Sequence, residues 1–268
     1  MPDQFVVAGG ARTHFLTEGS GPPVVLLHGL HGLAEHWQWV LPHLTDRVTC
    51  YLPEMIGHGR TERIRSDYRL DDYAAHVLAF MSEVGLDRAS IVGNSLGGAT
   101  ALRMAALEPG RVNRLVLACP AGLGGSSNTE ALRFVGGVLE MLAGVRTRAL
   151  ARWGERNQFA DPRRVDPAFF ESKEADARSR RSDPVFRKTS LRQARGIATL
   201  DRIDTTQIPH PTLVVWGTED KGLPWENSVR SVDRLPNGRL VLLRGCGHLP
   251  HVEQPERFAE LALKHLSA

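Results

Sequence analysis

Gly93-Asn94-Ser95-Leu96-Gly97 is the most informative motif of the chain. It follows a short apolar run, Ala89-Ser90-Ile91-Val92, and precedes a run of small residues typical of a helix, Gly98-Ala99-Thr100-Ala101-Leu102. A strand, a sharp G-x-S-x-G turn and a helix in this order form a nucleophile elbow. The two glycines leave room where a side chain would clash with the neighbouring strand and helix. The pattern predicts that Ser95 projects from the carboxyl edge of a sheet, at a helix N-terminus that favours negative charge.

Strand and helix patterns alternate on both sides of this turn. An opening hairpin is expected over residues 5–16, and later strands are expected over residues 24–27, 48–52, 90–92, 115–118, 212–216 and 240–243. Helical spacing of apolar residues is found over 37–44, 73–84, 225–235 and 258–266, and a helix should follow Ser95. Strands that alternate with helices indicate right-handed crossovers. We therefore predict an α/β fold with a doubly wound, mostly parallel sheet.

The alternation stops after Pro120-Ala121-Gly122 and returns at Thr212. Between Gly124 and Asp204 there is no strong strand signal, and the apolar residues Phe134, Val138, Leu139 and Leu142 recur at helical spacing. We interpret residues 124–204 as an inserted helical lid, and residues 1–123 and 205–268 as the core domain. We interpret the Arg-rich part of this insertion as a solvated face rather than a binding patch.

Candidate catalytic partners for Ser95 follow the last two expected strands. A serine hydroxyl needs a base to accept its proton, and the base needs a third group to fix its tautomer. In a doubly wound sheet these groups come from loops at the carboxyl ends of strands. Asp220, beside Glu219, follows one strand, and His248 stands in a glycine-rich loop after the next. The order Ser95, Asp220, His248 predicts a catalytic triad of nucleophile, acid and base.

Acyl transfer also needs donors for the oxyanion. We expect the backbone N–H groups of Leu96, directly after the nucleophile, and of Leu30, in the loop after the strand 24–27. The histidines His28, His31 and His36 near that loop lack nearby Asp or Cys ligands, so we predict no metal site there. No cofactor is predicted.

Composition places the chain among ordinary globular proteins. Its 268 residues are 42% hydrophobic and carry a formal net charge of +3, and no basic recognition motif is found, so a nucleic-acid partner is not expected. Neither a secretory signal nor a run long enough to span a membrane is found, and no membrane partner is expected. Three widely spaced cysteines fit a reducing compartment, so we predict a cytoplasmic protein. The oligomeric state is left open.

Taken together, these motifs resemble the α/β-hydrolase fold, in its lid-bearing form, over nearly the whole chain. The motifs are His28-Gly29 with Trp37, Gly57-His58-Gly59, the turn around Ser95, Gly217-Thr218-Glu219-Asp220 with Pro224, and Gly247-His248 with Glu253, Pro255, Glu256 and Phe258. Within that superfamily, Gly93 to Leu102 with Gly122-Leu123-Gly124-Gly125 downstream resembles the meta-cleavage product hydrolases, which split a carbon–carbon bond in vinylogous diketones. The resemblance implies that Asn94 holds substrate or oxyanion.

Two features depart from the meta-cleavage product hydrolases. Leu249-Pro250 follows His248 where that family tends to carry Trp, and Leu30-His31-Gly32 replaces a Gly-Pro-Gly loop. Our main prediction is therefore a serine esterase acting through an acyl-enzyme on a small, largely apolar substrate. The alternatives are a carbon–carbon hydrolase of dienoate diketones, and a ligand receptor or lyase on the same fold. An acyltransferase is also compatible with these residues. Ser95 argues against dehalogenases and epoxide hydrolases of this fold, which use a carboxylate nucleophile.

Overall fold

An eight-stranded sheet forms the centre of the protein. The computed structural model describes residues 1–123, 156–181, 185–198 and 203–268. The strand order is β1-β2-β4-β3-β5-β6-β7-β8. The strands are β1 (Gln4–Ala8), β2 (Ala11–Gly19), β3 (Pro23–Leu27), β4 (Thr49–Pro53), β5 (Ala89–Asn94), β6 (Val112–Ala118), β7 (Thr212–Gly217) and β8 (Gly238–Leu243). Strand β2 is antiparallel to β1 and β4, and the other pairs are parallel. The predicted hairpin and mostly parallel sheet are confirmed.

Both faces of the sheet are covered by helices. Helices α1 (Leu70–Glu83), α2 (Leu96–Leu107) and α7 (Val229–Asp233) pack on one face, and α9 (Pro255–Leu266) packs on the other. Successive residues of β3 point to opposite faces, so Val25 belongs to the core beneath α1 and α2 and Val24 to the core beneath α9. A strand buried on both faces must be apolar throughout, which explains the uninterrupted apolar run in β3.

The segment between β3 and β4 differs from its expected form. Helical spacing over residues 37–44 predicted one helix, whereas the structure has two short 3₁₀ helices, η1 (Ala34–Trp37) and η2 (Leu41–His43). Pro42 lies in the first turn of η2, where its missing N–H does no harm, but it prevents a longer helix from continuing through this point. The predicted apolar positions are nevertheless buried in the core beneath α9.

The segment after β7 also differs. One helix was expected over residues 225–235, but a 3₁₀ helix η6 (Trp225–Asn227) is followed by the short α7. The Ser228 hydroxyl donates a 2.7 Å hydrogen bond to the Trp225 carbonyl at the junction. Such local bonds from serine compete with regular helix bonding and interrupt the element.

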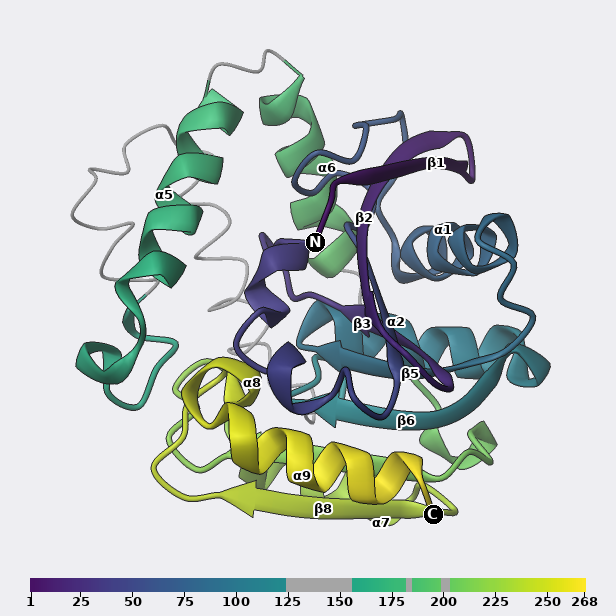
Figure 1. Cartoon of the computed structure of the whole chain (residues 1–268). Coiled ribbons are helices and arrows are strands. Elements are labelled where there is room, and N and C mark those ends of the chain that lie inside the picture. The colour runs from purple at the N-terminus through teal and green to yellow at the C-terminus, as the bar shows by residue number, and fades with distance from the viewer. Residues whose placement is uncertain (124–155, 182–184, 199–202) are drawn as a thin grey trace.

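The described part of the insertion is helical. In the sequence, α5 (Pro167–Arg181) and α6 (Phe186–Ala198) follow β6 and precede β7. Both helices lie beside the core (Figure 1). The helix expected around Phe134 to Leu142 lies outside the described residues. The division into a core and a lid therefore stays a prediction.

The order of the strands determines where a site can form. Strand β3 lies between β4 and β5, so the chain leaves β3 for one side of the sheet and returns to the other side with β5. Ligand sites in such sheets lie outside the carboxyl ends of the strands, where the winding reverses. The loop after β3 and the turn after β5 meet at this point.

Candidate active site

Ser95 occupies a strained turn between β5 and α2. Its backbone φ is 52° and ψ is −113°, a region that residues with a side chain rarely adopt. Its N–H donates to the Ala118 carbonyl at 3.0 Å, so the turn is bonded to the end of β6. A side chain on Gly97 would collide with the backbone oxygen of Leu27, and one on Gly93 with the carbonyl of Gly97. The two glycines of the motif are therefore required by close approach of the backbone.

His248 and Asp220 form a buried pair. His248 Nδ1 lies 2.6 Å from Asp220 Oδ2, and both residues are less than a tenth exposed. The other carboxylate oxygen of Asp220 accepts hydrogen bonds from the N–H groups of Gly222 and Leu223, both at 2.9 Å. The loop after β7 thereby fixes the carboxylate, which in turn fixes the orientation of the imidazole.

Burial and charge act in opposite directions on this pair. Burial favours the neutral imidazole of His248, but the charge and hydrogen bond of Asp220 outweigh it and raise the histidine pKa. Burial likewise favours a neutral Asp220, but the charge and hydrogen bonds from His248, with those from the loop amides, lower the pKa of the carboxyl group. The arrangement is that of an ionised acid that stabilises a protonated base.

Asn94 joins the serine turn to the histidine loop. Its side-chain amide donates to the carbonyl of His248 at 3.0 Å and to that of Ala118 at 3.1 Å. The backbone of His248 is therefore bonded to the residue that immediately precedes Ser95. With both amide hydrogens engaged, Asn94 serves here as a connector, and a direct role toward substrate or oxyanion stays a prediction.

Glu253 connects the histidine loop to the start of the described insertion. Its carboxylate accepts from the N–H of Gly247 and from that of Ala160, each at 2.8 Å. The His248 N–H donates to the carbonyl of Gln158 at 2.7 Å. The sequence indicated Glu253 only as a motif residue. Its bridging role was missed, because nothing in the sequence places residues 158–160 against this loop.

The loop after β3 lies against Ser95. A Cβ built on Gly29 would lie 3.2 Å from the Ser95 Cβ, so the loop passes close to Ser95 at Gly29. Leu30 is the next residue of this loop. The Met55 N–H donates to Nε2 of His28 at 3.1 Å, and Nδ1 of His28 lies 2.8 Å from the Gly29 carbonyl. His28 thus holds the loop through its contacts with main-chain groups. Leu96 is the first residue of α2, where N–H groups have no partner within the helix. The oxyanion roles of Leu30 and Leu96 stay predictions.

Cys119 is a neighbour of the pair that the sequence did not reveal. Its sulfur, a carboxylate oxygen of Asp220 and a ring nitrogen of His248 lie within 4.8 Å of one another. Cys119 is fully buried, and burial is the largest cause that raises the pKa of its thiol, which is therefore neutral. In the sequence, Cys119 is notable only as one of three widely spaced cysteines. The sequence signal that could have indicated this contact is the position of Cys119 directly after β6, the strand that lies between β5 and β7 in the sheet.

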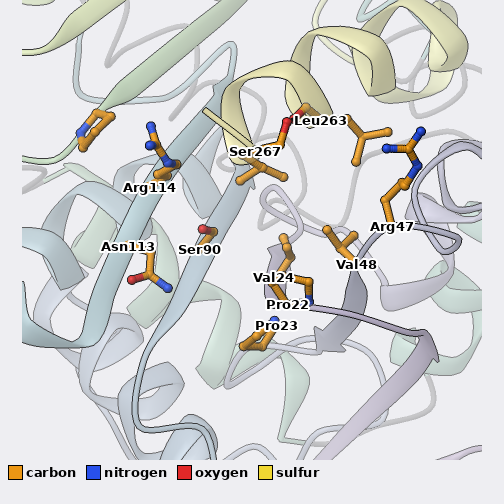
Figure 2. Close-up of a pocket in the computed structure, with 12 residues that line it drawn as sticks. Pro22, Pro23, Val24, Arg47, Val48, Ser90, Asn113, Arg114, Leu263 and Ser267 are labelled. Carbon is orange, nitrogen blue, oxygen red and sulfur yellow. Dashed lines mark hydrogen bonds between the residues drawn. The ribbon is translucent and has the colours of Figure 1, made fainter.

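A cavity of about 440 Å³ lies elsewhere on the protein. Ser90, at the amino end of β5, and Pro23, at the start of β3, line it, with Arg47 and Arg114 at its sides (Figure 2). Ser95 lies beyond the opposite end of β5. This cavity is therefore separate from the predicted catalytic residues.

A buried acid–imidazole pair beside a strained serine turn is the arrangement of a serine hydrolase. The chain matches the family model described as "alpha/beta hydrolase fold" over residues 22–255. It belongs to the α/β-hydrolase fold family.

The chain is similar to several enzymes over nearly its whole length. It is 30% identical to 2-hydroxy-6-oxo-6-(2'-aminophenyl)hexa-2,4-dienoic acid hydrolase of Metapseudomonas resinovorans, with 99% of this chain and 91% of that protein covered. It is 31% identical to 2-hydroxymuconate semialdehyde hydrolase of Pseudomonas sp. (strain CF600), with 96% and 90% covered. A solved serine hydrolase involved in carbazole degradation superposes with a TM-score of 0.81 at 30% identity, covering 99% of this chain and 98% of that one.

Among the described residues, no helix is long and apolar enough to cross a membrane.

The pKa of His248 predicts how activity depends on pH. A general base acts only when neutral, so kcat/KM should fall as the pH drops through the pKa of this histidine. Because that pKa is raised, we expect the acid limb to have its midpoint above about 6.5, the ordinary value for histidine. A pH profile of kcat/KM for the free enzyme measures this midpoint. A midpoint well below the ordinary value would contradict the pairing of His248 with Asp220.

Proposed function

We propose that this protein is a serine-dependent carbon–carbon hydrolase that acts on conjugated dienoate ketones or aldehydes of the meta-cleavage product type. The observation that carries the proposal is the 30–31% identity to two hydrolases of such compounds over 96–99% of the chain. The serine turn and the buried acid–base pair supply the groups that this reaction needs. This class was the alternative in the sequence analysis, and the relatives favour it over the esterase.

The proposed chemistry begins at Ser95. His248 removes the hydroxyl proton as the serine oxygen attacks the carbonyl carbon, and the N–H groups of Leu30 and Leu96 stabilise the resulting oxyanion. This step requires the 2-oxo tautomer of the substrate, in which the enol proton has moved to the carbon next to the attacked carbonyl. When the bond to that carbon breaks, its electron pair forms the dienolate of the leaving fragment, and the dienolate oxygen receives the proton from His248. Water then attacks the acyl-serine, with His248 again as base. Asp220 stabilises the imidazolium in both halves of the reaction.

Ester hydrolysis is the second candidate, and Leu249 favours it. Leu249 is buried with Phe159, Phe169 and Val252 directly after the predicted base. The meta-cleavage product hydrolases tend to carry Trp at this place. An aliphatic residue here leaves the site without that aromatic ring.

A direct comparison of substrates tests the proposal. We expect wild-type protein to bleach a chromogenic 2-hydroxy-6-oxo-hexa-2,4-dienoate with a kcat/KM at least about tenfold above that for p-nitrophenyl acetate or butyrate, a difference of about 1.4 kcal/mol in transition-state binding. Both activities should be absent in Ser95→Ala. A preference of the same size for the esters would contradict the carbon–carbon proposal and support the esterase.

A further inference from the structure

Lys173, on α5, contacts the loop that follows β3. Its half-buried ammonium group donates a 2.9 Å hydrogen bond to the backbone carbonyl of His31. The contact joins residues 142 positions apart in the sequence. It is a charge-assisted bond, which is shorter and stronger than a neutral one.

The contacted loop is a strained turn. Gly32 N–H donates to the Gly29 carbonyl at 2.9 Å, which closes a four-residue turn with Leu30 and His31 at its centre. His31 has a φ of 56°, in the left-handed region that a β-turn normally fills with glycine or asparagine. A histidine there costs on the order of 1–2 kcal/mol, so neighbouring contacts must hold it. Lys173 supplies one of these contacts.

The same turn carries a predicted oxyanion donor. Gly29, at its first position, lies against Ser95, and the N–H of Leu30 belongs to the next residue. Lys173 therefore holds the carbonyl of the residue that follows this donor.

We propose that Lys173 is a positioning residue that fixes the strained turn Gly29–Gly32 and directs the Leu30 N–H at the oxyanion formed on Ser95. The insertion thereby supplies part of the stabilisation of the transition state. The proposal rests on the Ser95 nucleophile of the proposed function, but not on the identity of its substrate.

A purely structural role for Lys173 would be to dock α5 on the core, and other contacts already do this. Trp39 Nε1 donates to Asp166 Oδ2 at 3.3 Å, and Phe169 packs against Trp39 and His36 with ring centroids 5.6 and 4.8 Å apart. None of the residues in these contacts belongs to the turn Gly29–Gly32. Trp39→Phe, which removes a hydrogen bond between insertion and core without touching the turn, is therefore the matched control for Lys173→Met.

The test is the second-order rate at which a fluorophosphonate labels Ser95, because this reaction passes through the same oxyanion site whatever the natural substrate. Complete loss of one oxyanion donor costs about 10²–10³ in rate, so its misplacement should cost roughly tenfold. We expect Lys173→Met and Lys173→Gln to label about tenfold more slowly and to lose kcat with KM within about twofold on any substrate the wild type turns over. Lys173→Arg should recover most of the rate, and Trp39→Phe should stay within about twofold of wild type.

Equal losses in Lys173→Met and Trp39→Phe, or an unchanged rate in both Lys173 variants, would overturn the proposal. Unfolding curves for every variant separate these results from a folding defect, and the Gln variant keeps the test open where Met fails to fold. A wild-type protein that is not labelled at all would instead refute the Ser95 nucleophile on which the proposed function depends.

Discussion

Ser95→Ala is expected to abolish turnover and leave the fold intact. The hydroxyl is the proposed nucleophile, and removal of a nucleophile that acts together with its base costs roughly 10⁴-fold or more in kcat. The hydrogen bonds that hold the turn come from the backbone N–H and carbonyl of Ser95, which alanine keeps. Alanine tolerates the φ of 52° about as poorly as serine does, so the free energy of unfolding should change by no more than about 1 kcal/mol.

Steady-state kinetics and denaturant unfolding of the purified variant measure both effects. Gly98→Ala is not a suitable control, since a side chain there would collide with Pro120. Thr218→Ala serves better, because among the described residues its hydroxyl bonds to Glu219, Leu243 and Gly245, at the end of β8 and in the loops after β7 and β8, and not to Ser95. Activity near the wild-type level in Ser95→Ala would refute the nucleophile.

Asp220→Asn is expected to have the second-largest effect. The amide preserves the size of the side chain but offers no negative charge to His248, so the imidazole loses both its preferred tautomer and the stabilisation of its protonated form. We expect kcat to fall by about 10⁴. The acid limb of the pH profile should also move to lower pH, because the charge of Asp220 is what raises the pKa of His248 against burial.

Glu219→Gln is the matched control for this variant. Glu219 is adjacent in sequence and also carries a carboxyl group, but it is exposed, whereas Asp220 is buried beside the imidazole. We expect its kcat within about twofold of wild type, since surface substitutions away from a site have small effects. Similar losses in the two variants, measured in the same assay, would contradict the assignment of Asp220 as the acid.

The predictions that succeeded rest on local sequence chemistry. Apolar runs such as Val24 to Leu27 can be buried on both faces of a sheet, and Gly93 is required by its close approach to the carbonyl of Gly97 within the same turn. The mostly parallel sheet follows from such signals. The placement of Asp220 and His248 in loops after β7 and β8 needed only the general rule that sites form at the carboxyl ends of strands.

What was missed depends on contacts between distant segments. His14 and Glu54 form a fully buried pair, with His14 Nδ1 3.0 Å from Glu54 Oε2, although the sequence gives no reason to pair them. Cys119 near the imidazole, Glu253 between two amides and Lys173 on the turn after β3 are of the same kind. Each depends on how loops and the insertion pack in space, which periodicity and local motifs do not encode. The short helices around Pro42 and Ser228 were missed because helical spacing does not distinguish 3₁₀ turns from a continuous helix.

The activation of Ser95 by His248 and Asp220 is tested most directly by identifying the residue that carries a covalent adduct after exposure to a fluorophosphonate. Peptide mass spectrometry of the labelled protein should place a single phosphonyl group on Ser95, with none on Ser95→Ala and much slower labelling of Asp220→Asn. An adduct on another residue, or an active protein that is never labelled, would contradict the claim that Ser95 is activated by His248 and Asp220.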